Sequence, residues 1–284
     1  MIGAVILSVW TGLVSLQAAE IDPSEKGYFR RHVWHWAIAF GASLADGEYE
    51  DRVGTSSDPL LFSDPPWADR RGRDWFARED AGKPFFEENT SKIALTAGVA
   101  TIVFANLGEK RSGRWMADDA TGLLEVWFFD KGASGLVKNI VGRQRPELEY
   151  LDDQEDLTPE ERAEEMDKRS NRQSFYSGAA SRQFALMSYV DAIVAGRTQS
   201  RAARVASFLG FYSFASYAGY TRLRQDRHYV SDVVAGAAAG IFTGRGFYKA
   251  HHRPPRVASR RPRLRLESLA LLPGGAAVLF SVGP

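Results

Sequence analysis

Three clusters of polar residues in the second half of the chain have the types and spacing expected of a site that binds an anion and transfers a group. In the first, KNIVGRQRP, Lys138 and Arg145 are seven residues apart. On a helix this spacing puts both cations near one face, and the helix should end before Pro146. The two side chains could then converge on one anion. The same spacing is also typical of a solvated helix face.

The second cluster, SFYSGAAS at residues 174–181, has the composition of a phosphate-binding helix start. Ser177 and Gly178 precede a helical run, and the backbone N–H groups at the start of a helix attract phosphate. Gly178 allows the oxygens to approach closely, and the Ser177 hydroxyl adds a donor. The alternative interpretation is an ordinary serine N-cap.

The third cluster, TRLRQDRHYVSD, joins a histidine to a carboxylate. His228 and Asp232 are four residues apart, which places both on one face of a helix. The carboxylate could hold one imidazole nitrogen while the other acts as a nucleophile. Arg222 would offer a planar fork to two phosphate oxygens. A helical His–Asp pair on its own is also common as a purely structural feature.

Together, and in this order, the three clusters resemble the phosphatidic acid phosphatase type 2 superfamily, which includes bacterial acid phosphatases, lipid phosphatases and vanadium haloperoxidases. The resemblance covers roughly residues 90 to 245. It implies an all-α helical bundle of that type. It also implies a phosphate cradle made by Lys138, Arg145, Ser177, Gly178 and Arg222.

The resemblance further implies a reaction. His228 would be the nucleophile that becomes a phosphohistidine, Asp232 would orient it, and the chemistry would need no metal or cofactor. Members of the family continue Ser-Gly with a histidine that protonates the leaving oxygen, whereas this chain has Ala179. General acid catalysis is worth about 100- to 10,000-fold, so we expect leaving-group protonation to be impaired.

The expected function is hydrolysis of a phosphomonoester or diphosphate, with a lipid-linked substrate and a membrane surface among the candidate partners. Two alternatives stay open: a non-catalytic phosphate- or phospholipid-binding protein, and a haloperoxidase whose cradle holds vanadate. With a net charge of only +1, the protein as a whole has no positive electrostatic field that would attract nucleic acid. The absence of cysteine excludes disulfides and thiol nucleophiles. The oligomeric state is not predicted.

The elements that must position these clusters are helices. From Thr90 onward, long apolar stretches rich in Ala and Gly predict the core of a bundle over residues 90–250. Each stretch is short for a membrane span and the mean hydropathy is −0.28, which favours a soluble bundle, although the small residues would also suit membrane packing. Thr158, Pro159 and Glu161 form a capping-box signal for a solvated helix or a lid.

The two ends of the chain differ from this pattern. Residues 1–19 contain no charged side chain and end in small residues, which predicts a signal peptide and an exported, periplasmic or envelope-associated protein; an uncleaved anchor and a buried helix are the alternatives. Residues 20–89 are rich in Gly, Asp, Pro and aromatics, which predicts irregular structure with short helices.

The last segment, residues 251–284, is predicted to be a basic tail followed by a β-hairpin around Pro273-Gly274-Gly275. His251 and His252 fall in this tail and are expected to be solvated. His35, near the other end of the chain, is expected to be a packing or surface residue. None of these histidines is placed by the sequence to replace the missing acid at position 179.

Overall fold

The computed structural model describes residues 27–55, 65–77, 85–106, 112–150, 158–252, 263–272 and 275–283. The predicted signal peptide lies outside the described residues. The chain divides into two units: one spans residues 28–251, and the other combines residues 1–27 with residues 252–284.

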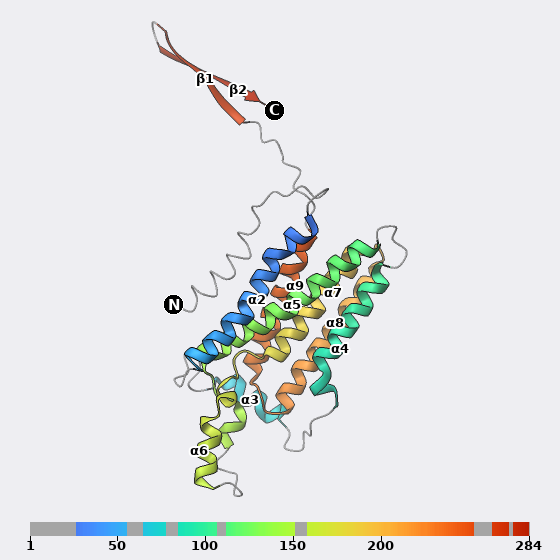
Figure 1. The fold of residues 1–284 in the computed structure, drawn as a ribbon, viewed down its shortest axis with the longest axis vertical. Helices are drawn as coiled ribbons and strands as arrows, with labels where there is room; N and C mark the ends of the chain where they lie inside the picture. The colour runs from blue at the N-terminus through green and yellow to red at the C-terminus, as the bar shows by residue number, and fades with distance from the viewer. Residues whose placement is uncertain are drawn as a thin grey trace. The chain divides into compact units, whose positions relative to one another are not determined.

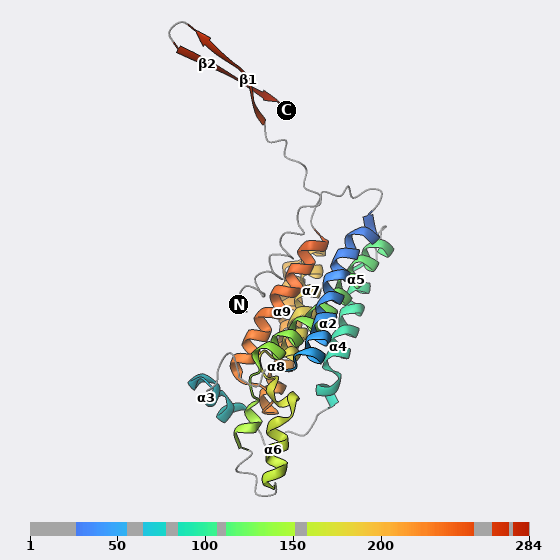
Figure 2. The same ribbon diagram turned by 60° about the vertical axis from the view of Figure 1, so that its left-hand side comes forward.

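The unit of residues 28–251 is a helical bundle, so the predicted all-α fold is confirmed. In Figures 1 and 2, α2, α4, α5, α7, α8 and α9 run side by side, with α3 and α6 at one end. None of the described helices combines the length and apolarity needed to cross a membrane. The helices and 3₁₀ turns are α2 (Gly27–Arg52), α3 (Trp67–Phe76), α4 (Phe85–Asn106), α5 (Ser112–Val141), η2 (Pro146–Tyr150), α6 (Pro159–Asp167), η3 (Arg169–Arg172), α7 (Gly178–Arg197), α8 (Arg201–Arg224) and α9 (Val230–His251).

Helices α7 and α9 pack closely along their length, and glycines make the close approach of the two backbones feasible. A Cβ on Gly240 would lie 2.1 Å from the carbonyl oxygen of Ser181, and one on Gly244 would lie 2.1 Å from that of Ala185. Any larger side chain would force the helices apart. The packing brings the first turns of both helices together, and the N–H of Ser177 donates to the carbonyl oxygen of Asp232 at 3.0 Å.

The prediction of irregular structure with short helices over residues 20–89 is wrong for α2, which is a helix of 26 residues. It holds for α3, which has ten residues. The helical bundle therefore begins well before Thr90. One physical reason is that α2 packs on α5 partly through its backbone: a Cβ on Gly132 of α5 would lie 2.4 Å from the carbonyl carbon of Ala42. Contact through small residues leaves little apolar periodicity in the sequence.

The capping box predicted for α6 is confirmed. The Thr158 hydroxyl accepts from the N–H of Glu161 at 3.3 Å, and the Glu161 carboxylate accepts from the N–H of Thr158 at 2.9 Å. Pro159 occupies the start of the helix, where its missing N–H costs nothing. No side chain of α6 is buried, which favours the interpretation of a solvated helix.

The C-terminal residues form two antiparallel strands, β1 (Arg263–Leu272) and β2 (Gly275–Gly283). In their register Arg263 faces Gly283 and Leu272 faces Gly275, with an irregularity between Leu266 and Ser268. The strands flank the turn predicted at Pro273-Gly274-Gly275, of which the first two residues lie outside the described part of the chain.

Candidate active site

His228 lies in the bend between α8 and α9 and is 3% exposed. The expectation that it shares a helix with Asp232 is wrong, because α9 begins only at Val230. The Nδ1 atom of His228 is 2.8 Å from the carbonyl oxygen of Ser174. Since a carbonyl oxygen can only accept, Nδ1 carries the proton and the neutral ring keeps its lone pair on Nε2.

Asp232, in the first turn of α9, does not hold the imidazole directly. Its Oδ2 is 3.8 Å from Nδ1 of His228, which is beyond hydrogen-bond distance. That oxygen instead accepts from the Ser174 hydroxyl at 2.5 Å and from the N–H of Tyr229 at 2.9 Å. Asp232 therefore fixes the two segments that flank the imidazole, and its negative charge lies close to the ring.

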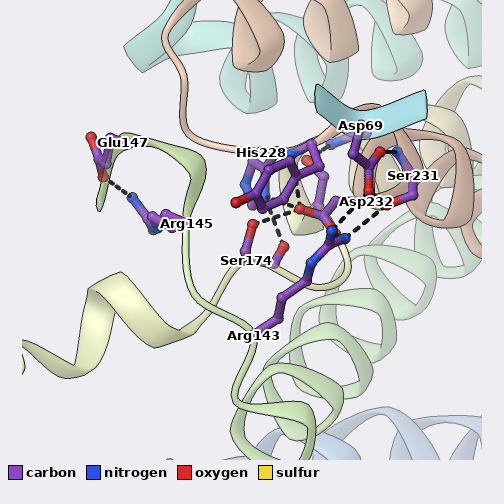
Figure 3. Close-up of polar contacts among 11 residues, drawn as sticks. Asp69, Arg143, Arg145, Glu147, Ser174, His228, Ser231 and Asp232 are labelled. Carbon is purple, nitrogen blue, oxygen red and sulfur yellow. Dashed lines mark hydrogen bonds and ion pairs between the residues drawn. The ribbon is translucent and has the colours of Figure 1, made fainter. Parts of the chain in front are cut away.

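Arg143 joins this carboxylate to a second one (Figure 3). Its Nη1 donates to Oδ1 of Asp232 at 2.6 Å, and its Nη2 donates to Oδ2 of Asp69 at 2.8 Å. Asp69, from α3, also accepts from the N–H of Ser231 at 2.8 Å. The guanidinium carbon of Arg143 lies 4.1 Å from the ring centre of Tyr229, a cation–π contact. All three charged groups are buried.

The protonation state of this centre follows from burial and charge. Burial lowers the pKa of His228 to about 4, with Lys138 and Arg222 adding to burial and Asp232 opposing it. Burial disfavours ionisation of Asp232, but the neighbouring His228 and Arg143 outweigh it and hold the pKa of that carboxyl below its usual value. At neutral pH a neutral imidazole therefore lies beside a carboxylate.

Lys138 lies in the last turn of α5 and points to the start of α7. Its Nζ would be 3.4 Å from a Cβ placed on Gly178. Burial, together with repulsion from Arg145, Arg182 and Arg222, lowers the pKa of Lys138 to about 8. The four cations are thus close enough to destabilise one another's charge, which an anion bound among them would relieve.

Arg145 and Arg222 reach this region from separate segments. Because α5 ends at Val141, the expectation that Lys138 and Arg145 share a helix face is wrong. Arg145 lies in the following segment, where its Nη1 is 3.6 Å from Oε1 of Glu147; Figure 3 shows this pair to the side of the Asp232 cluster. Arg222, in the last turn of α8, donates to Oε1 of Gln225 at 3.0 Å.

Comparison with protein families matches residues 119–256 to the PAP2 superfamily. This segment belongs to the PAP2 superfamily. All three polar clusters fall within it, and membership supports a phosphatase-type function in general terms. Comparison with curated proteins and with solved structures finds no match.

The helix start in the PAP2 segment forms as predicted, with Ser177 as the N-cap of α7 and Gly178 as its first residue. The Ser177 oxygen accepts from the N–H of Ala180 at 3.4 Å, so Ser177 caps the helix as the serine-cap interpretation predicts. Ala179 is the second helical residue and is partly exposed. Its methyl group can neither donate nor accept a proton.

Arg182 and Asp130 are charged residues of the PAP2 segment that were not predicted from the motifs. Arg182 lies one turn after Gly178 on α7, a helical spacing that could have identified it. Asp130, on α5 two turns before Lys138, accepts a hydrogen bond from Ser181. Burial raises the pKa of Asp130 to about 6, against the opposing effect of Arg182. Arg143, Asp69 and Ser174 were also missed, because their partners are distant in sequence.

Proposed function

We propose that the chain is a phosphatase that hydrolyses a phosphomonoester or diphosphate through a phosphohistidine at His228. The observation that carries the proposal is a buried, neutral imidazole with Lys138 and Arg222 beside it and two further cations close to Lys138. Burial and mutual repulsion among these cations lower the pKa of Lys138, and phosphate is a fitting counter-ion for them. The cations are Lys138, Arg145, Arg182 and Arg222.

In the first step, the Nε2 lone pair of His228 attacks phosphorus. An N–P bond forms, the P–O bond to the leaving group breaks, and that oxygen takes the electron pair. The ring becomes cationic while Nδ1 keeps its proton, and the carbonyl oxygen of Ser174 and the Asp232 carboxylate stabilise it. The cationic side chains stabilise the charge on the equatorial phosphate oxygens.

In the second step, water attacks the phosphorus of the phosphohistidine. The N–P bond breaks, inorganic phosphate leaves, and His228 returns to the neutral tautomer. With Ala179 in place of a proton donor, the leaving oxygen must take its proton from water, and no imidazole assists the attacking water as a base. Both steps should be slowed, most of all for leaving groups of high pKa.

A lipid phosphate is the substrate class that the surface near Arg222 favours. Four exposed aromatic side chains on α3 and α8 lie at this end of the bundle, with exposed fractions from 41% to 74%. Amphipathic aromatic rings are enriched where proteins meet the membrane interface. The export signal predicted at residues 1–19 would bring the chain to such a surface. The four aromatics are Trp67, Trp75, Tyr217 and Tyr220.

A second candidate function is phosphate or phospholipid binding without turnover, and Ala179 is the observation that favours it. A cradle with no proton donor could bind a phosphoryl group and fail to release the alcohol. The haloperoxidase alternative would use the same cradle for vanadate.

Hydrolysis of nitrophenyl phosphate and of a diphosphate, with phosphate binding followed by calorimetry, separates these functions. A phosphatase should be inhibited by vanadate and should lose turnover in His228→Ala. A binding protein should bind phosphate, show no turnover, and keep binding in that variant. Vanadate-dependent oxidation of halide by peroxide would instead indicate a haloperoxidase. A lipid phosphate in mixed micelles should be hydrolysed faster than its short-chain analogue if the membrane surface contributes.

A further inference from the structure

Two histidines and a glutamate meet inside the bundle, away from the His228 site. His35 comes from α2, Glu125 from α5 and His251 from the end of α9, three helices that lie side by side in Figures 1 and 2. The Nδ1 atom of His35 is 3.0 Å from Nε2 of His251, and that Nε2 is 2.6 Å from Oε2 of Glu125. Nδ1 of His35 is 3.6 Å from the same carboxylate oxygen.

These three donor atoms form a triangle of the size that one metal ion requires. Zinc binds nitrogen and oxygen ligands at about 2.0–2.1 Å in tetrahedral sites, so neighbouring ligand atoms lie about 3.3 Å apart. The edges of the triangle, at 2.6, 3.0 and 3.6 Å, bracket that value. Small side-chain rotations would place an ion at equal distances from all three atoms.

Burial favours a positive charge at this place. The side chain of Glu125 is fully buried and that of His251 is 2% exposed, while His35 is 16% exposed. A buried carboxylate is costly unless a cation accompanies it. Two imidazole nitrogens that face each other at 3.0 Å also need a proton or an ion between them. A divalent cation would satisfy both requirements together.

A buried hydroxyl stands where a supporting group for the metal ligands would be expected. The Tyr189 hydroxyl is buried and has no hydrogen-bond partner among the described residues. A Cβ on Gly122 would lie 2.0 Å from that hydroxyl and 2.7 Å from Nδ1 of His251, so both atoms reach the same gap. Metal-bound histidines usually hydrogen-bond through their second nitrogen. Gly122, nearly one turn before Glu125 on α5, keeps this gap open.

We propose that His35, Glu125 and His251 bind one divalent transition-metal ion. Two imidazoles and a carboxylate suit Zn²⁺ well, with water as the fourth ligand. Asp232 lies in the first turn of α9 and His251 is its last residue, so a rise of 1.5 Å per residue separates them by about 28 Å. The ion therefore has a structural role: it ties α2 to α5 and α9 and takes no part in phosphoryl transfer.

The test uses the full chain, stripped with a chelator and titrated with Zn²⁺ by calorimetry, with elemental analysis of the protein as purified. We expect one ion per chain. At a free Zn²⁺ concentration a hundred times the Kd, the Tm should rise by about 5 °C or more. Co²⁺ should bind at the same stoichiometry and give the visible d–d absorption of a site of low coordination number. Failure of the unmodified chain to bind one equivalent overturns the proposal.

Variants locate the ion. His251→Ala and Glu125→Gln should each weaken Zn²⁺ binding by at least about 100-fold, as the loss of a ligand does more than the loss of a supporting group. Asp119→Asn is the matched control: it removes another buried carboxylate of α5, which pairs with Arg197 at 2.5 Å, and should leave Zn²⁺ binding intact. Binding that persists in Glu125→Gln and His251→Ala would show that these side chains share a proton and not a metal ion.

Discussion

The imidazole of His228 donates its Nδ1 proton to the carbonyl oxygen of Ser174, 2.8 Å away. A backbone carbonyl does not ionise, so it selects this tautomer at every pH at which the ring is neutral. Asp232 is then available for Arg143, and its Oδ1 accepts a hydrogen bond from Nη1 of Arg143 at 2.6 Å. The imidazole of His228 is thus oriented by the backbone, and the carboxylate acts on it through the surrounding framework and through charge.

The lowered pKa of His228 predicts how stability depends on pH. The folded value is about 4 and the ordinary value is 6.5, so between them the unfolded chain binds more protons and stability rises with pH. The contribution of this one group should reach about 3 kcal/mol. We expect the difference in the free energy of unfolding between the unmodified protein and His228→Asn, measured in urea, to rise by this amount from pH 4 to pH 6.5.

The comparison with His228→Asn is needed because Asp130 acts in the opposite direction. Its folded pKa is raised to about 6, so its contribution is lost as pH rises through that value. Asp130 is present in both proteins and its effect cancels in the difference. A difference that stays flat over this pH range would mean that His228 titrates normally in the fold.

Lys138 should make anion binding sensitive to alkali. With a pKa of about 8, its charged fraction falls about tenfold between pH 7 and pH 9. Sulfate keeps its double charge over this range, so its affinity, measured by calorimetry, should fall by up to about tenfold. Lys138→Arg, which stays charged, should remove most of that dependence. Equal pH dependence in both proteins would place Lys138 outside the anion site.

Ala179→His should restore a proton donor at the start of α7. If Ala179 limits turnover, hydrolysis of alkyl phosphates should rise at least about 100-fold, while nitrophenyl phosphate, whose leaving group needs little protonation, should gain less. Ala179→Asn is the control, since it adds a polar side chain of comparable reach that cannot act as an acid. An equal gain in both variants would point to substrate positioning and not to proton transfer.

Arg143 should matter more for stability than any surface cation near it. Arg143→Met leaves Asp69 and Asp232 buried without their shared partner and should lower the free energy of unfolding by about 3–5 kcal/mol. Arg227, which is 38% exposed and 2.9 Å from Glu147, is the control, and Arg227→Gln should cost less than about 1 kcal/mol. Denaturant unfolding of the two variants checks this, and similar losses would contradict the central position of Arg143.

Local signals in the sequence predicted local structure well. The box of Thr158 and Glu161 and the Ser177 cap depend on residues three apart, so the sequence contains the whole interaction. The long helix α2 was missed because it depends on contacts with α5, where Gly132 meets the backbone of Ala42. Nothing within residues 27–52 reveals that partner.

The same distinction applies to the candidate site. The motifs identified His228, Asp232 and Lys138, and the fold brings them together at the starts of α7 and α9. They did not reveal that His228 precedes its helix, nor that Arg143 binds Asp69, 74 residues away. Such contacts arise from the packing of α3 and α9 against the rest of the bundle. The cluster that contains His251 was hidden in the same way, because its three members come from three helices.

A phosphoryl group on His228 is the central claim, and its capture is the most direct test. The chain is mixed with nitrophenyl phosphate, quenched in alkali, where phosphohistidine survives, and analysed by peptide mass spectrometry. Because no imidazole at position 179 assists water, the intermediate should accumulate. We predict a burst of nitrophenol and a phosphate on the peptide that contains His228, both absent from His228→Ala. Turnover with no burst and no label on His228, or a label that persists in the variant, would contradict the mechanism.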